Sequence, residues 1–229
     1  MSDRVPAPQS ERELLSRAQA LAGLSLGELA ARHSLPVPAE ARRGKGFAGA
    51  LLEFALGADA ASRPVPDFTA IGVELKTIPI DAAGQPREST YLTTAPLRGL
   101  GGVRWEGSLL RQKLARVLWV PIESAPSQAL PMRRIGWPIL WSPSPEEESQ
   151  LRTDWEELMS LLVTGQVAEL DSRQGRWLQI RPKAADGKAL TRSSDDTGAP
   201  GMALPRGFYL RPAFTRRVLG SAVAGATAP

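Results

Sequence analysis

The sequence contains no cysteine and a single histidine. The absence of cysteine excludes disulfides, thiolate nucleophiles and cysteine-ligated zinc sites. It is compatible with a reducing compartment. The single histidine, His33, excludes a multi-histidine metal site, and a Ser-His-Asp triad would depend on that one residue. A metal in this protein is therefore expected to be held by oxygen ligands.

The 229-residue chain also lacks a run of about 18 apolar residues that would span a bilayer, and no apolar signal core follows Met1. We therefore expect a cytoplasmic protein with no membrane contact. A hydrophobic content of 42% is enough for a real core in one large domain or two closely packed lobes.

Lysine is scarce as well. The net charge of +4 and the pI near 9.8 favour a polyanionic partner, yet of the 28 basic residues 23 are arginines and only five are lysines. Where arginine is used almost everywhere, a retained lysine indicates a need that the wide guanidinium fork cannot meet. Four of the five fall in segments that resemble a site: Lys45, Lys76, Lys113 and Lys183.

The segment from Asp67 to Thr77 carries the most specific chemistry. Its second half alternates like a strand, so Glu74 and Lys76 share one face, about 6.5 to 7 Å apart along the backbone. Asp67 follows a proline-rich breaker and is expected at a turn that brings a second carboxylate to the same point. Two converging carboxylates require a cation, and oxygen ligands suit Mg²⁺. The pattern predicts phosphodiester hydrolysis, the alternative being a strand with a solvated charged face.

Two helices beside this strand carry further candidates. Glu53 lies on an expected helix whose small residues form a bare stripe, so a ligand could approach it closely; tight helix packing with a solvated Glu53 is the alternative. Lys113 lies on an expected helix over residues 106–115, next to a buried strand over 117–122. Its ammonium would meet a phosphate or belong to a solvated face.

The remaining elements follow from local signals. Capping boxes predict helices after Ser10 and Ser25, and Ser144 caps a third helix whose acidic first turn is explained by the helix dipole rather than by a metal. Strands are expected over 88–94, which carries Tyr91, and over 176–181, which ends in Arg181. A polar loop over 186–201 would order on a nucleic acid. A short C-terminal helix ends near Gly220, and residues 220–229 are expected to be a disordered tail.

Seven segments, in order and with matching spacing over residues 10 to 217, resemble the MutH family of DNA mismatch repair endonucleases. They are LGELA (26–30), KGFAGALLE (45–53), DFTAIGVELKTIP (67–79), RVLWVP (116–121), WSPSPEEE (141–148), LQIRPKA (178–184) and LPRGFYL (204–210). The resemblance implies a restriction-endonuclease-like α/β fold, a mixed sheet flanked by helices, in one domain (1–219) of two lobes around a DNA cleft. It also implies Mg²⁺-dependent nicking of the unmethylated strand at hemimethylated GATC by a monomer, stimulated by MutL after MutS has found a mismatch.

The resemblance also assigns roles by position. It implies catalytic roles for Asp67, Glu74 and Lys76, with Asp67, Glu74 and the Leu75 carbonyl on the metal. Glu53 would be an accessory acid at a second metal position and Lys113 a further catalytic or phosphate-binding lysine. The residues expected to contact or read DNA are Lys45, Tyr91, Arg181, Lys183 and Tyr209.

Two rival functions remain open at this point. A type II restriction endonuclease would use the same acid and lysine set but cut both strands, usually as a dimer. A DNA-binding module without chemistry would give no reason for the full set of acids and lysines.

Overall fold

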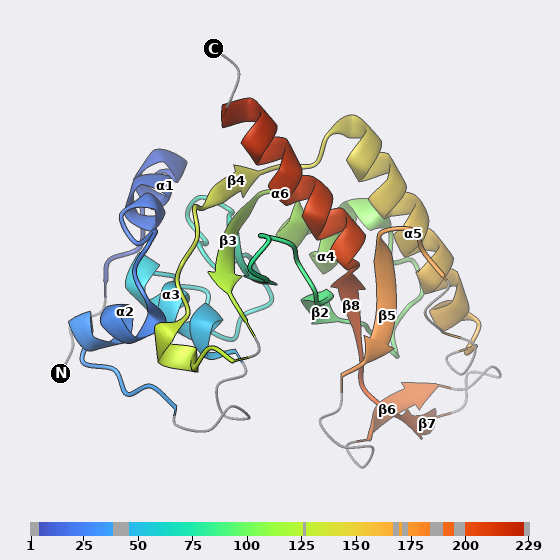
Figure 1. Ribbon diagram of the computed structural model, residues 1–229. Coiled ribbons are helices and arrows are strands. Elements are labelled where there is room, and N and C mark those ends of the chain that lie inside the picture. The colour runs from blue at the N-terminus through green and yellow to red at the C-terminus, as the bar shows by residue number, and fades with distance from the viewer. Residues whose placement is uncertain are drawn as a thin grey trace. The chain divides into compact units, whose positions relative to one another are not determined.

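The computed structural model describes residues 5–38, 46–125, 127–166, 170, 174–183, 190–194 and 200–226. The chain forms a mixed α/β structure with two compact units (Figure 1). Unit 1 comprises Met1–Glu88, Lys113–Ser142 and Arg216–Pro229, and unit 2 comprises Ser89–Gln112 and Pro143–Thr215.

Unit 1 is built on a three-stranded mixed sheet in the order β1-β3-β4. Strand β1 (Glu74–Ile80) pairs in parallel with β3 (Val117–Glu123), which pairs antiparallel with β4 (Ile139–Trp141). Three helices precede the sheet in the chain: α1 (Glu11–Gln19), α2 (Leu26–Arg32) and α3 (Phe47–Leu56). A 3-10 turn, η2 (Leu130–Met132), lies in the connection to β4.

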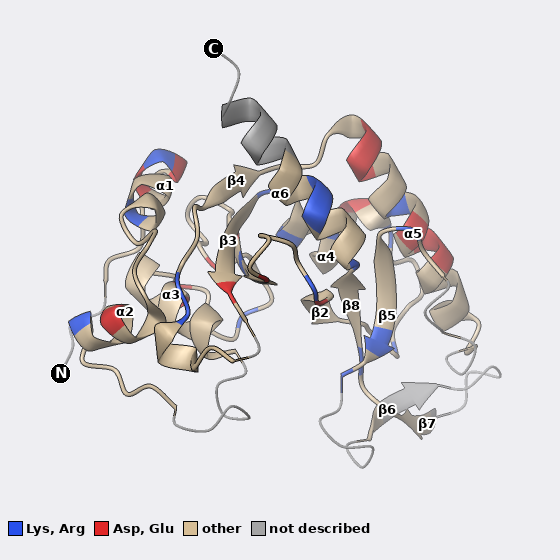
Figure 2. Cartoon of the chain, in the orientation of Figure 1, with Lys and Arg blue, Asp and Glu red and all other residues tan. Residues whose placement is uncertain are grey.

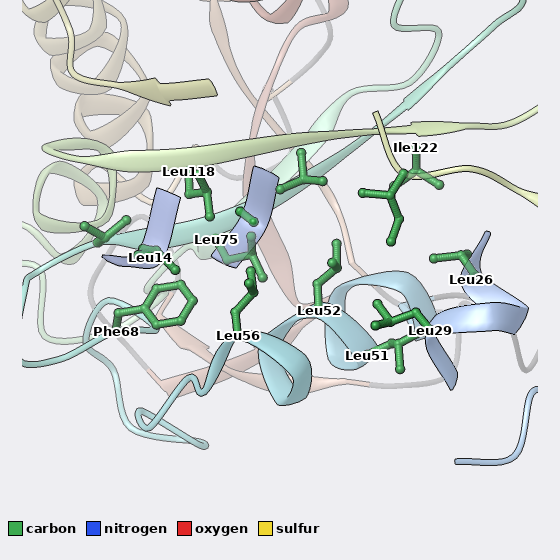
Figure 3. Packing of buried hydrophobic residues seen from close by; sticks show 14 of the residues in the cluster. Leu14, Leu26, Leu29, Leu51, Leu52, Leu56, Phe68, Leu75, Leu118 and Ile122 are labelled. Atoms are coloured by element: carbon green, nitrogen blue, oxygen red, sulfur yellow. The ribbon is translucent and has the colours of Figure 1, made fainter. Parts of the chain in front are cut away.

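The core of unit 1 packs these helices against one face of the sheet. Leu75 of β1 and alternate residues of β3, such as Leu118 and Ile122, lie in one cluster with leucines of all three helices, among them Leu14 and Leu52 (Figure 3). Because strand side chains alternate, burying Leu75 in this cluster directs Glu74 and Lys76 to the opposite face. The hydrophobic pattern therefore decides which way the charged pair points.

Unit 2 contains an antiparallel sheet in the order β2-β8-β5. Its strands are β2 (Thr90–Thr94), β8 (Arg206–Leu210) and β5 (Leu178–Pro182). Helix α5 (Pro145–Val163) and the 3-10 turn η1 (Trp105–Gly107) also belong to this unit. The short helix α4 (Leu109–Leu114) and the C-terminal helix α6 (Pro212–Ala226) each contain residues of both units.

Of the two expected capping boxes, the one at Ser25 is confirmed in full, and the expected cap at Ser144 also forms a complete box. Ser25 with Glu28 and Ser144 with Glu147 each exchange both hydrogen bonds, and the acidic first turn of α5 is red in Figure 2. At α1 the box is only half formed. Ser10 accepts the Glu13 N–H, but the Glu13 carboxylate accepts the N–H of Gln9 instead of that of Ser10.

Three other elements differ from the sequence expectation. Part of the expected polar loop forms two antiparallel strands, β6 (Thr191–Ser194) and β7 (Pro200–Ala203). Backbone hydrogen bonds hold this pair, and the sequence shows no alternation of apolar residues that would have predicted it. Helix α4 starts later than expected, because Gly107 and Ser108 interrupt the turn and Ser108 Oγ caps Arg111 N–H. Helix α6 continues past Gly220 to Ala226, where alanines favour the helix. None of the helices described is long and apolar enough to cross a membrane.

Candidate active site

A tight turn places Asp67 beside the start of β1. Phe68 and Val73 form an antiparallel bridge, with Phe68 N–H donating to the Val73 carbonyl at 2.9 Å. Gly72 closes the turn with a φ of 65°, a conformation that glycine adopts without strain. In this register the residue before Phe68 lies opposite the residue after Val73, so Asp67 faces Glu74. The expected turn is confirmed.

The backbone of β1 adds a third oxygen at this edge of the sheet. Glu74 N–H donates to the Arg116 carbonyl on the β3 side, whereas Leu75 N–H donates to Asp67 Oδ2 at 2.9 Å. The N–H and C=O of one strand residue point to the same side, so the Leu75 carbonyl also faces the edge on which Asp67 lies. Pro79, four residues after Leu75, would direct its N–H to the same edge, but proline has none, so no donor is left unpaired there.

Two lysines from different elements converge on Glu74. Lys76 Nζ donates to Glu74 Oε1 at 2.5 Å, and Lys113 Nζ donates to Oε1 and Oε2 at 2.9 and 2.8 Å. The Glu74 side chain is 1% exposed, and the lysines are 15% and 14% exposed. A buried carboxylate is stable only when its charge is compensated, and here two ammonium groups do this.

The acids of this cluster fit a hard divalent cation. Burial, and then the neighbouring Glu74 carboxylate, raise the pKa of Asp67 to about 6. Such repulsion is relieved when a cation lies between the two carboxylates, and the Leu75 carbonyl supplies a third oxygen. Within the described ranges no three Asp, Glu or His side chains come together as a metal site. The candidate set is therefore two carboxylates and one carbonyl, with water completing the shell.

One expected acid is not joined to this cluster. Glu53 lies on α3 with an exposed side chain, and no hydrogen bond or ion pair links it to Asp67 or Glu74. Its neighbours Leu51 and Leu52 are buried in the core. Lys45 lies outside the described residues.

Asp59 is a residue that the sequence reasoning missed. Its carboxylate accepts the N–H and the hydroxyl of Thr69, at 2.8 and 2.5 Å, and these bonds hold the pKa of Asp59 below its usual value. The N–H groups of Asp59 and Ala60 donate to the Asp67 carbonyl at 3.0 and 3.1 Å. Asp59 thus holds Asp67 and Thr69, the residues on either side of Phe68, at the start of the turn. An Asp followed by a polar turn was the only sequence signal, and such signals are common.

Unit 2 gathers four of the five residues expected to contact DNA. Tyr91 of β2 and Tyr209 of β8 are register partners whose rings meet edge to face, 5.4 Å apart. The Arg181 guanidinium lies 5.7 Å from the centre of the Tyr209 ring, and Lys183 Nζ lies 4.4 Å from that of Tyr91. The end of β5 that carries Arg181 is blue in Figure 2. Two cations over two aromatic rings form a surface suited to a nucleic acid.

Asp154 of α5 holds the start of β5 in place. Its carboxylate, 1% exposed as a residue, accepts the N–H groups of Arg176, Trp177 and Leu178 at 2.9, 2.6 and 2.8 Å. Gln150 adds a fourth bond at 2.8 Å. This second missed residue fixes the strand that ends in Arg181.

Comparison with known proteins identifies the family. The family model described as the DNA mismatch repair enzyme MutH matches residues 56–154, a range that contains Asp67, Glu74, Lys76 and Lys113. The chain is 53% identical over 219 residues to the DNA mismatch repair protein MutH of Serratia proteamaculans, covering 96% of each chain. It is 55% identical to that of Pectobacterium atrosepticum, covering 93% of this chain and 92% of the relative.

The MutH protein of Vibrio cholerae is 52% identical over 214 residues, covering 93% of this chain and 97% of the relative. Identity above half along nearly the whole length extends well beyond the acid and lysine motif. The chain therefore belongs to the MutH family of DNA mismatch repair endonucleases.

Proposed function

We propose that this endonuclease uses Mg²⁺ to nick the unmethylated strand at hemimethylated GATC sites. The observation that carries the proposal is the cluster of Asp67, Glu74, Lys76 and Lys113 at the start of β1, in which Glu74 is buried and the other three are partly buried. A DNA-binding module would not need a buried carboxylate held by two partly buried lysines beside a second acid, because buried charge is costly.

The oxygen ligands proposed for the cation are the Asp67 and Glu74 carboxylates and the Leu75 carbonyl. When bound there, Mg²⁺ supplies Lewis-acid chemistry that stabilises charge on the phosphoryl oxygens and on the leaving 3′ oxygen. Glu53 is proposed as an accessory acid at a second metal position. It has no bond to the cluster, so it would have to act with the DNA in place.

The two lysines are proposed to act on the water and the phosphate. Lys76 Nζ, which donates to Glu74, has further N–H groups that position the attacking water. Lys113, held on both Glu74 oxygens, donates to a phosphoryl oxygen as negative charge develops there. Asp67 keeps its orientation through the bond from Leu75 N–H.

Recognition of the site is assigned to unit 2 together with Lys45. Arg181 and Lys183 are proposed to read guanine, because a basic side chain against O6 and N7 discriminates bases by about 1 to 3 kcal/mol. Tyr209 is proposed to lie near the adenine methyl position, with Tyr91 beside it. We propose that residues 1–219 act as one endonuclease domain and that both of its lobes contribute to DNA binding.

The proposed setting is the cytoplasm. The chain would act there as a monomer and be stimulated by MutL after MutS has recognised a mismatch.

The direct test is nicking of a hemimethylated GATC duplex by Glu74→Gln and Lys76→Met. Each should lose about 100-fold or more in rate, the usual value for a group that stabilises the transition state. Calorimetry with Mg²⁺ separates their roles, because Glu74→Gln should lose cation binding and Lys76→Met should keep it. Glu156→Gln, which changes an exposed acid of α5, is the control. Wild-type nicking by either cluster variant would refute the assignment.

Methylation and strand number test the finer claim. Plasmid that is unmethylated, half-methylated or fully methylated should be nicked in the first two cases and spared in the third, with added MutL raising the rate. Linear product from a dimeric enzyme would instead favour a type II restriction endonuclease.

A further inference from the structure

A hydrogen-bonded cluster of three groups lies on the sheet of unit 2. Lys183 Nζ donates to Tyr91 Oη at 2.7 Å and to Thr94 Oγ1 at 3.1 Å. The two hydroxyls are themselves hydrogen-bonded at 3.0 Å. The cluster joins residues about 90 positions apart, since the sequence separations are 92 and 89. We call Lys183, Tyr91 and Thr94 the lysine seat.

The central strand makes room for the lysine seat. Gly207 of β8 pairs with Thr94 on one side and with Arg181 on the other. A Cβ at Gly207 would come within 2.9 Å of Tyr91 Cε2 and 3.1 Å of Tyr209 Cε2. The bare backbone at this point therefore lets the Tyr91 ring lie across the sheet beneath Lys183. The backbone bond from Lys183 N–H to the Pro205 carbonyl, at 2.8 Å, fixes the base of the side chain.

The seat leaves the ammonium group with one unused donor. A lysine has three N–H donors, and two of them are taken by the hydroxyls. No carboxylate of the described residues forms an ion pair with Lys183. A free lysine is a flexible point charge that binds any phosphate, whereas this one is held over the Tyr91 ring with one donor available.

We infer that Thr94, together with the Tyr91 hydroxyl, is a positioning residue that makes Lys183 specific for one base acceptor. The inference rests on the proposed function, in which Lys183 reads the DNA site. Fixing the ammonium before the DNA arrives removes rotamer freedom that would otherwise be lost on binding and restricts which acceptor the free N–H reaches. The hydroxyls contribute no charge, so they affect selectivity rather than the attraction to phosphate.

The test compares DNA binding without divalent metal, by fluorescence anisotropy, on a GATC duplex and a duplex of the same composition with that site scrambled. Thr94→Val keeps the shape and removes one hydroxyl, and Tyr91→Phe keeps the ring and removes the other. Each should lower the ratio of the two affinities about tenfold, the value of one bond to a charged group. The slope of log affinity on log salt should stay unchanged, because Lys183 keeps its charge.

Two further variants separate positioning from folding. Thr94→Ser keeps the hydroxyl and should restore the wild-type ratio. Thr93→Val makes the same change one residue earlier, at a side chain without a hydrogen bond to any residue that the structure describes, and should have no effect. A ratio unchanged in Thr94→Val, or Thr94→Ser as impaired as Thr94→Val, would overturn the inference.

The lysine can also be observed directly in the free protein. With only five lysines in the chain, ¹⁵N-lysine NMR can resolve the ammonium groups. The Lys183 signal should be protected from exchange in the wild type and lose that protection in Thr94→Val. Suppose that Thr94→Val loses both the exchange protection and the affinity ratio, but the wild type nicks no GATC plasmid. The proposed nuclease function then fails, and the lysine seat stands. If the wild type nicks normally but Thr94→Val shows neither change, only the role of the lysine seat is refuted.

Discussion

Replacing Lys113 by methionine should destabilise the protein strongly when metal is absent. Lys113 is the only donor among the described residues that reaches Glu74 Oε2, and it also donates to Oε1. The Glu74 carboxylate is 1% exposed, so water cannot readily take over the lost bonds. Methionine keeps the length and apolar volume of the lysine stem, so the change removes charge and hydrogen bonds more than packing.

The magnitude follows from the burial of the pair. Removing one partner of a fully buried ion pair costs about 3 to 5 kcal/mol, because the other charge stays buried and unpaired. Here Lys76 still compensates part of the Glu74 charge through its 2.5 Å bond to Oε1. We therefore expect Lys113→Met to lower the free energy of unfolding by about 2 to 3 kcal/mol, below that range.

A matched control is available nearby. Arg111 forms a salt bridge of 2.7 Å with Glu148, comparable in length, but the side chains are 42% and 29% exposed. Arg111→Met should cost at most about 1 kcal/mol, as exposed ion pairs do. The comparison isolates burial, because both variants replace a paired basic residue by methionine.

Urea unfolding with EDTA, followed by the same experiment with Mg²⁺, measures both effects. Mg²⁺ bound to Asp67 and Glu74 would compensate the carboxylate again, so added Mg²⁺ should recover part of the loss in Lys113→Met. A loss in EDTA no larger than that of Arg111→Met would refute the claim that Glu74 depends on buried lysines. An unchanged gap in Mg²⁺ would contradict the proposed metal ligands.

Three further substitutions test the supporting residues. Asp59→Ala should slow nicking about tenfold with unchanged DNA affinity, since it frees Thr69 in the turn that follows Asp67. Asp81→Ala, which removes two similar bonds from an exposed turn, should not slow nicking, and equal rates for the two variants would exclude a positioning role for Asp59. Asp154→Ala leaves three backbone N–H groups without their acceptor and should cost about 3 kcal/mol or more by urea unfolding; a loss under 1 kcal/mol would contradict this. Gly207→Ala should push two tyrosine rings aside and weaken GATC binding with little change in stability, and unaltered binding would show that the rings do not matter.

Local rules in the sequence correctly predicted most of the helices and strands and one half of the acid cluster. Glu74 and Lys76 lie two residues apart on a strand, and their common face follows from a period of two. The breaker before Asp67 predicted its turn. The cap at Ser25 was predicted from the acid three residues later, and the cap at Ser144 from the proline and acidic residues that follow it. In each case the interacting groups are neighbours in the chain.

The contacts that complete the site join residues far apart in the chain. Lys113 reaches Glu74 across 39 residues because β1 and β3 pair in parallel, and Lys183 reaches Tyr91 across 92 because both strands flank β8. The pairing of β6 with β7 also escaped prediction, since its ladder uses backbone groups that every residue carries.

The sequence by itself therefore determined the fold class, the strand that carries the central acid and lysine, and the family. Only the tertiary structure decided which distant lysine joins that acid, and that Asp59 and Asp154 anchor the segments that carry function. The physical reason is that propensity, period and capping depend on adjacent residues, whereas strand order and register depend on how the whole apolar core packs.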